Sequence, residues 1–253
     1  MLWARRDASS GLMRRKACTV FRPSGPAPAG VIFDLDGTLI DSGADIASAA
    51  NAVRVRCGLS RLDAPVVAGY VGDGARMLLQ RVLAHPDGDG SAPPKPDRET
   101  LDRALAMFLD IYAENVLVET RPYPGVERLL AGLADRPLML ATNKPRRLTV
   151  AILAGLGWTD VFARVVAGDD LTRRKPHPDH LVACLEGRDL ATAEVAMVGD
   201  SPNDIMPARA LGMIAIGVGW GLVAPELVHD ARPDRYVADV DELADALGAR
   251  AQP

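Results

Sequence analysis

Three short apolar runs, each leading into a carboxylate or a hydroxyl, constrain the fold of this chain more than any other feature. They occupy residues 31–33, 138–141 and 195–198. Short apolar runs bounded by turn residues are typical of strands that are buried on both faces, as the strands of parallel sheets are. Stretches with helical spacing alternate with these runs along the chain. The sequence therefore predicts an α/β fold with a doubly wound parallel sheet.

The polar residues at the ends of these runs define a candidate site. Parallel strands end at one edge of the sheet, and ligands of open α/β sheets bind at that edge. Asp34 and Asp36 follow the first run, Thr142 and Asn143 follow the second, and Asp200 follows the third. Neighbouring carboxylates repel one another, so a bound cation is a reason for keeping them ionised. Mg²⁺ suits such a set, since it takes few carboxylates and keeps its other positions for water and substrate phosphate.

A lysine adds a positive charge to these groups. Lys175 precedes Pro176, and proline is common at the first position of a helix, so we expect a helix to open there. A lone aspartate at the end of a strand is more often a helix cap or a turn residue, but capping does not explain three aspartates together with a lysine. The set favours a site for an oxyanion and a hard divalent metal ion.

A helical block separates the first predicted strand from the second. Apolar residues recur at helical spacing in three stretches of this block, namely 46–57, 77–83 and 101–112. We therefore expect residues 30–42 and 122–253 to form the α/β core, and residues 43–121 to form a separate helical domain.

Residues 1–29 differ in composition from the remainder of the chain. Residues 1–30 carry six arginine or lysine side chains and a single aspartate, a formal charge of +5, so the remainder of a chain with net charge −4 carries −9. Pro, Gly and Ala dominate residues 23–30, which is typical of a linker. We interpret residues 1–29 as a basic, disordered extension, with an organellar transit peptide as the alternative.

Composition excludes several classes of protein. The acidic body of the chain argues against nucleic acid as a partner. No apolar run approaches the roughly 20 residues that cross a bilayer, so we expect no membrane partner. The three cysteines, Cys18, Cys57 and Cys184, show neither metal-site nor disulfide spacing. They fit a reducing compartment, so we expect a cytoplasmic protein, and the sequence leaves monomer and homodimer open.

Four motifs in order carry a family resemblance. They are DLDGTL at 34–39, the pair Thr142-Asn143, Lys175, and GDSPND at 199–204. In this order they resemble the haloacid dehalogenase-like phosphohydrolases over roughly residues 30–248. DLDGTLIDS, TNKP and GDSPNDIMPARALGM are, within that superfamily, similar to segments of the phosphoglycolate phosphatases. The resemblance implies a Rossmann-like core with a helical cap inserted after the first strand, which would be the domain at 43–121.

The resemblance also implies a role for each carboxylate. Asp34 would attack phosphorus and form an aspartyl-phosphate, and Asp36 would act as general acid and then as general base. Mg²⁺ would be held by Asp34, by the backbone carbonyl of Asp36 and by Asp200. Asp204 would either ligate the metal through water or hold Lys175, and we favour the second role.

The remaining candidates would bind substrate. Thr142, Asn143 and Lys175 would stabilise charge on the phosphoryl oxygens, and Gly37 would form the turn beside them. In the cap, Arg76 follows the glycine-rich turn 72–74, and its guanidinium can form a bidentate pair with a carboxylate.

These expectations describe a phosphatase for a small phosphorylated acid. The resemblance implies hydrolysis of 2-phosphoglycolate to glycolate and phosphate. One alternative is a phosphatase for a sugar or amino-sugar phosphate with the same mechanism. A second alternative is a non-catalytic regulatory protein on this fold. The retention of Asp34, Asp36, Lys175 and Asp200 argues against the second alternative.

Overall fold

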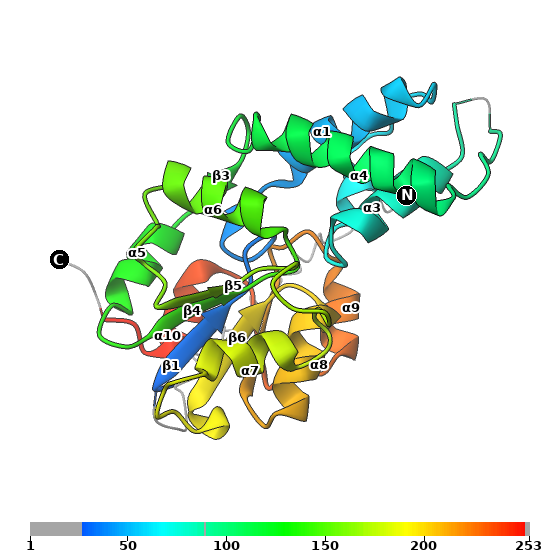
Figure 1. The fold of residues 1–253 in the computed structure, drawn as a ribbon. Helices are drawn as coiled ribbons and strands as arrows, with labels where there is room; N and C mark the ends of the chain where they lie inside the picture. Colours follow the sequence, from blue (N-terminus) through cyan, green and yellow to red (C-terminus); the bar gives the residue numbers. More distant parts are fainter. Residues whose placement is uncertain (1–26, 89, 251–253) are drawn as a thin grey trace, which may run out of the picture.

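The computed structural model describes residues 27–88 and 90–250, and within them the central element is one parallel sheet (Figure 1). Its six strands are hydrogen-bonded in the order β5-β4-β1-β6-β7-β8, and each neighbouring pair runs parallel. The strands are β1 (Gly30–Phe33), β4 (Leu138–Ala141), β5 (Arg164–Val166), β6 (Val195–Gly199), β7 (Ile214–Val218) and β8 (Arg235–Val237). The predicted α/β fold is confirmed. The three apolar runs of the sequence are β4, β1 and β6, which lie side by side at the centre.

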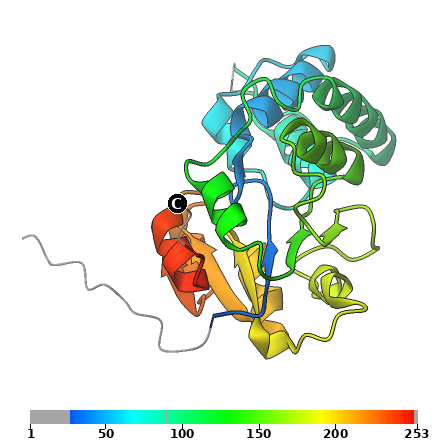
Figure 2. The same cartoon turned by 90° about the vertical axis from the view of Figure 1, so that its left-hand side faces the viewer.

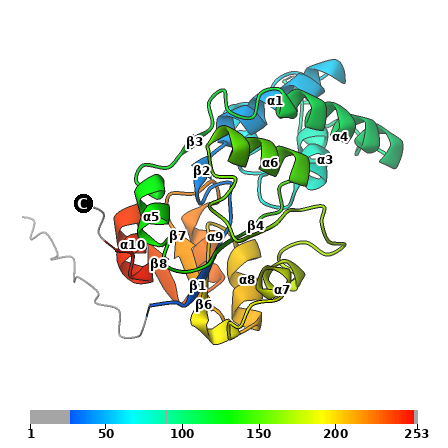
Figure 3. The ribbon, with the colours of Figure 1, turned by 60° about the vertical axis from the view of Figure 1, so that its left-hand side comes forward.

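Helices cover both faces of the sheet, as Figure 3 shows. On one face lie α5 (Val126–Gly132), α6 (Arg146–Gly155) and α10 (Val240–Leu247), and on the other lie α7 (Asp179–Leu185), α8 (Pro202–Ala210) and α9 (Pro225–Asp230). A short 3₁₀ helix, η1 (Thr192–Glu194), precedes β6. Side chains of a strand alternate between the two faces, so Val31 and Phe33 join one apolar cluster and Ile32 joins the other. This burial on both faces explains why the central strands are continuously apolar.

A helical insert lies at one end of the sheet (Figures 1 and 2). It contains α1 (Gly43–Arg56), α2 (Ala64–Ala68), α3 (Ala75–Ala84) and α4 (Arg98–Ala113). The short strands β2 (Ile40–Asp41) and β3 (Arg121–Pro122), which flank the insert, pair antiparallel. The predicted helical insertion after the first strand is confirmed. The sequence had indicated α1, α3 and α4, whereas the five-residue α2 had not been recognised.

The longest helix of the insert, α4, shows why these residues form a helix. Asp97 caps its N-terminus by accepting a hydrogen bond from the backbone N–H of Thr100 at 2.8 Å. Its buried residues, Leu101, Ala104, Phe108 and Tyr112, recur three or four positions apart and so form one stripe. That stripe packs against α1 and α3, and the C-terminal part of it reaches the cavity described below.

The structure differs from the sequence prediction at Pro176. This residue does not open a helix, because residues 176–178 form turns and α7 begins only at Asp179. This irregular segment carries Lys175 inward, where its side chain is buried.

Residues 1–26 of the predicted basic extension lie outside the described residues. Within the described part of the chain, no helix combines the length and the apolar character needed to cross a membrane.

Candidate active site

The central strands bring the predicted site residues together. Asp34 follows β1, Thr142 follows β4, and Asp200 follows β6. The backbone N–H of Asp34 donates to the carbonyl of Val198 at 2.9 Å, and that of Thr142 donates to Val166 at 3.0 Å, so the strand pairing extends to the site. All three polar side chains are buried. Their position at one edge of the sheet is the one expected from the strand order.

Three of the carboxylates form a compact group. One oxygen each from Asp34, Asp200 and Asp204 lies within 4.8 Å of the others. Burial raises the pKa of Asp34 to about 6, although Lys175 opposes this shift. Burial, and then the charges of Asp204 and Asp34, raise the pKa of Asp200 well above its usual value. A buried set of oxygen ligands that repel one another fits a hard divalent cation, so these three residues can hold a metal ion.

Lys175 neutralises part of this charge. Its ammonium lies 2.9 Å from Oδ1 of Asp34 and donates to Oδ1 of Asp204 and to the carbonyl of Ala141, each at 2.6 Å. Burial lowers the pKa of Lys175, but Asp204 and Asp34 together raise it above its ordinary value. The other oxygen of Asp204 accepts from the hydroxyl of Ser201 at 2.7 Å. The contact with Lys175 is the one we expected for Asp204.

Two glycines allow these side chains to approach the backbone. Gly37 has φ +81°, a conformation that favours glycine, and a Cβ there would lie 2.1 Å from Oδ2 of Asp200. A Cβ at Gly199 would lie 2.1 Å from Cγ of Asp204. Both positions therefore require glycine for the carboxylates to occupy their places.

The carboxylate of Asp36 lines the same cavity as Asp34 but is not part of the three-carboxylate group. Its side chain accepts from the hydroxyl of Ser42 at 2.5 Å and from Nζ of Lys144 at 2.8 and 3.0 Å. Its expected contact with a metal runs through its backbone carbonyl, which stays a prediction. Lys144 was not assigned a role from the sequence. The available signal was its place two residues after Thr142, in the TNKP segment at the end of a buried strand.

Asn143 connects the core to the insert. Its side-chain amide donates to the carbonyl of Gly72 at 2.8 Å and to the carbonyl of Lys175 at 2.9 Å. The side chain of Asn203 donates to the carbonyl of Gly72 at 3.2 Å and to Oδ1 of Asp73 at 2.7 Å. The turn 72–74 of the insert therefore rests on the site edge of the core.

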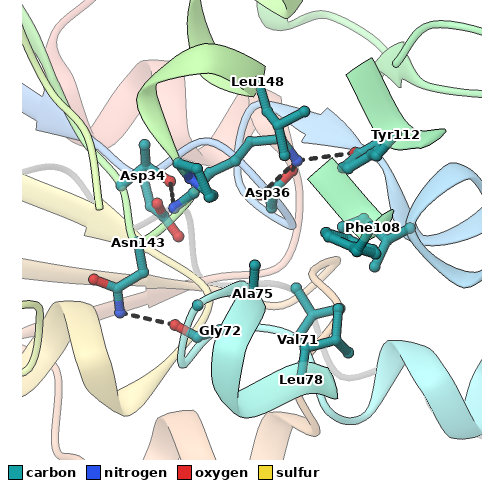
Figure 4. A pocket seen from close by; sticks show the side chains of 15 residues that line it. Asp34, Asp36, Val71, Gly72, Ala75, Leu78, Phe108, Tyr112, Asn143 and Leu148 are labelled. Carbon is teal, nitrogen blue, oxygen red and sulfur yellow. Dashed lines mark hydrogen bonds and ion pairs between the residues drawn. The ribbon is translucent and has the colours of Figure 1, made fainter. Parts of the chain in front are cut away.

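A cavity of about 470 Å³, counting the space open to solvent, lies between the core and the insert. Figure 4 shows Asp34, Asp36 and Asn143 on its core side and Leu78, Phe108 and Tyr112 on its insert side. The structure does not bring Arg76 to the cavity wall. Its guanidinium pairs with Asp102 on α4, and 40% of its side chain is exposed.

Fold and site together define a hydrolase class. The model of the haloacid dehalogenase-like hydrolase family matches residues 31–218, so the chain belongs to that family and is an enzyme. Among its relatives, a phosphoglycolate phosphatase of Neisseria gonorrhoeae is 39% identical over 222 residues, which are 86% of this chain and 92% of the relative. A phosphoglycolate phosphatase of Chromobacterium violaceum is 40% identical and covers 86% of this chain and 95% of its own length.

A solved structure agrees with this assignment. The crystal structure of a predicted phosphoglycolate phosphatase from Haemophilus somnus has a TM-score of 0.77 and 27% identity to this chain. The similarity covers 87% of this chain and 96% of that protein. The insert therefore has a counterpart in a related fold, and we refer to it below as the cap.

Proposed function

We propose that the protein hydrolyses the phosphate ester of a small acid, with 2-phosphoglycolate as substrate and glycolate and phosphate as products. The observation that carries the proposal is the position of Asp34, which is buried at the centre of the sheet edge with Lys175 2.9 Å from its Oδ1. The relatives named phosphoglycolate phosphatase support the choice of substrate.

The chemistry begins with a nucleophile that needs no base. Phosphate monoesters hydrolyse extremely slowly, and covalent catalysis divides that barrier into two steps. An ionised carboxylate of Asp34 attacks phosphorus, the P–O bond to the leaving group breaks, and an aspartyl-phosphate forms. Asp36 gives a proton to the leaving oxygen and later takes one from the water that cleaves the acyl-phosphate.

The anionic nucleophile must approach an anionic phosphate. A Mg²⁺ ion held by Asp34 and Asp200, with the backbone carbonyl of Asp36, would supply positive charge between the two anions. Lys175 supplies a second positive charge, and Asp204 keeps its ammonium in place through the 2.6 Å hydrogen bond. Thr142 lines the cavity and offers a hydroxyl to the phosphoryl oxygens.

The cap favours a small substrate. Leu78, Phe108 and Tyr112 narrow the cavity, and the turn 72–74 contacts the core directly. By displacing part of the water around the substrate, these side chains would strengthen charge interactions inside the site.

A substrate panel with a nucleophile variant tests the proposal. We expect wild-type protein with Mg²⁺ to release phosphate from 2-phosphoglycolate faster than from hexose and amino-sugar phosphates. Asp34→Asn should abolish phosphate release while its circular dichroism spectrum and unfolding curve stay close to those of wild type. Asp160→Asn is the matched control and should retain activity, because Asp160 is exposed and does not line the cavity. Preference for a sugar phosphate would contradict the substrate, and turnover by Asp34→Asn would contradict the nucleophile.

A further inference from the structure

Lys144 is a buried cation whose position the proposed chemistry has not yet used. It follows β4, and only 6% of the residue is exposed. Its ammonium donates to both oxygens of Asp36, at 2.8 and 3.0 Å, and to the hydroxyl of Tyr112 at 2.9 Å. It also lies 4.6 Å from the centre of the Tyr112 ring, a cation–π distance. Removing a lysine from water costs free energy, so these contacts must compensate for it.

The same ammonium lies at the wall of the cavity. Among the lining residues that the structure describes, Lys144 is the single arginine or lysine, beside the carboxylates of Asp34 and Asp36. Lys175 also contacts Asp34, but its other contacts are with Asp204 and Ala141 of the core, and it is not among the residues that line the cavity. The positive charge on the cap side of the site therefore comes from Lys144.

The geometry of a phosphorylated acid relates the proposed general acid, Asp36, to Lys144. If Asp36 protonates the leaving oxygen, that oxygen must lie within hydrogen-bonding distance of the Asp36 carboxylate. In 2-phosphoglycolate the carboxylate carbon is only two bonds from the leaving oxygen. Nζ of Lys144 lies 2.8 Å from Oδ1 of Asp36. The substrate carboxylate would therefore arrive beside the ammonium of Lys144.

We propose that Lys144 recognises the carboxylate of the substrate and selects small phosphorylated acids. Tyr112 of the cap holds the ammonium in place through its hydroxyl and the face of its ring. This inference rests on the proposed function and names the residue that sets its substrate class. A charge-assisted hydrogen bond to the Lys144 ammonium at the cavity wall favours an anionic group. The same charge repels the ammonium group of an amino-sugar phosphate, which separates the two substrate classes.

A comparison of two nearly isosteric esters isolates this role. The substrates are 2-phosphoglycolate and its amide, carbamoylmethyl phosphate, which lacks the negative charge at the same position. The quantity measured is the ratio of kcat/KM for the acid to kcat/KM for the amide. In Lys144→Met we expect this ratio to fall at least about tenfold, and in Lys144→Arg we expect most of the preference to remain.

Arg147→Met is the matched control. Arg147 lies on α6 and pairs with Asp110 of α4, so it also joins the core to the cap, but it is exposed and outside the cavity. We expect its ratio to match that of wild type. If Lys144→Met lowers both rates by one factor and leaves the ratio unchanged, Lys144 only positions Asp36 and the inference is overturned.

Binding without turnover keeps the test decisive if Lys144→Met is inactive. The acid and the amide are each titrated calorimetrically into Asp34→Asn and into the Asp34→Asn, Lys144→Met double variant. For each protein the ratio of the two dissociation constants measures the preference for the acid. At least a tenfold loss for the acid alone supports the inference, and equal losses refute it. A wild-type enzyme without preference for the acid would instead contradict the proposed substrate. If wild type prefers the acid and Lys144→Met keeps that preference, only the role of Lys144 is contradicted.

Discussion

The carboxylate of Asp45, in the first turn of α1, accepts two hydrogen bonds from Thr120, which lies 75 residues further along the chain. The backbone N–H of Thr120 donates at 2.9 Å and its hydroxyl at 2.7 Å. The backbone N–H of Glu119 donates to the same carboxylate at 3.0 and 3.1 Å. Asp45 therefore joins the segment that enters the cap to the segment that leaves it.

Asp45→Ala should destabilise the protein by about 3 kcal/mol, because it leaves the two buried donors of Thr120 and the partly buried N–H of Glu119 without their acceptor. Thr120→Val removes one donor only and should cost about 1 kcal/mol. Urea unfolding of both variants measures the two costs. Equal stability of Asp45→Ala and wild type would show that the carboxylate does not contribute to the junction.

His180 gives the protein a pH-dependent stability. It is buried on α7, and neither ring nitrogen has a hydrogen-bond partner within the described residues. Burial, and then the charge of Lys175, lower its pKa from 6.5 to about 4. Between these two values the unfolded chain takes up a proton that the folded protein does not. The contribution of His180 to the free energy of unfolding is therefore fully present above about pH 6.5 and is lost as the pH falls toward 4.

From pH 7 to pH 5 this contribution should amount to about 2 kcal/mol. Urea unfolding at the two pH values measures it. His180→Leu removes the titrating ring and should lose about 2 kcal/mol less than wild type over the same interval. Cys57→Ser, a change on the surface, is the control and should follow wild type. Identical pH dependence in wild type and His180→Leu would contradict this assignment.

The centre of the sheet could be predicted because its strands are buried on both faces. β1, β4 and β6 are continuously apolar and end in polar residues, so each carries a local signal. β5 and β8 are short edge strands that begin with Arg164 and Arg235, and they have residues that are only half buried. A single-sequence pattern does not distinguish such strands from loops.

The site could be predicted only where its residues terminate a strand or belong to a motif. Asp34, Thr142, Lys175 and Asp200 meet this condition, and the structure brings them together. Lys144 belongs to the TNKP motif, but the motif does not reveal its contacts with Asp36 and Tyr112, residues 108 and 32 positions away, which only the folded chain creates. The glycine-rich turn before Arg76 led to the prediction that Arg76 binds substrate. That prediction missed its ion pair with Asp102, which lies on another helix and meets Arg76 only in the folded chain.

Removal of divalent metal should abolish activity and lower stability. Bringing Asp34, Asp200 and Asp204 together costs repulsion that a divalent cation relieves. A metal at ten times its dissociation constant should stabilise the folded protein by about 1.4 kcal/mol. Thermal unfolding with and without Mg²⁺ after treatment with a chelator measures this independently of turnover. Asp200→Ala should need more Mg²⁺ for the same shift, and an unchanged requirement would remove Asp200 from the set of ligands.

Gly199→Ala should disable the site while the rest of the fold remains. The added Cβ would lie 2.1 Å from Cγ of Asp204, and a contact under 3.0 Å forces something to move. Asp204 is held on α8 by Ser201 and in turn holds Lys175 at 2.6 Å, so its displacement shifts the ammonium beside Asp34. A misplacement of about 1 Å in a catalytic arrangement can cost roughly a hundredfold in rate, and overpacking costs about 1–3 kcal/mol of stability.

The measurement for Gly199→Ala is kcat/KM together with urea unfolding, and Gly69→Ala is its control. The backbone of Gly69 has an ordinary helical φ of −63°, and a Cβ there would meet nothing nearer than 3.6 Å. Gly69→Ala should therefore keep both activity and stability near wild type. We expect Gly199→Ala to lose at least about tenfold in kcat/KM with a cooperative unfolding transition still present. Wild-type turnover in Gly199→Ala would mean that Lys175 keeps its place without Asp204, and the positioning role of Asp204 would have to be abandoned.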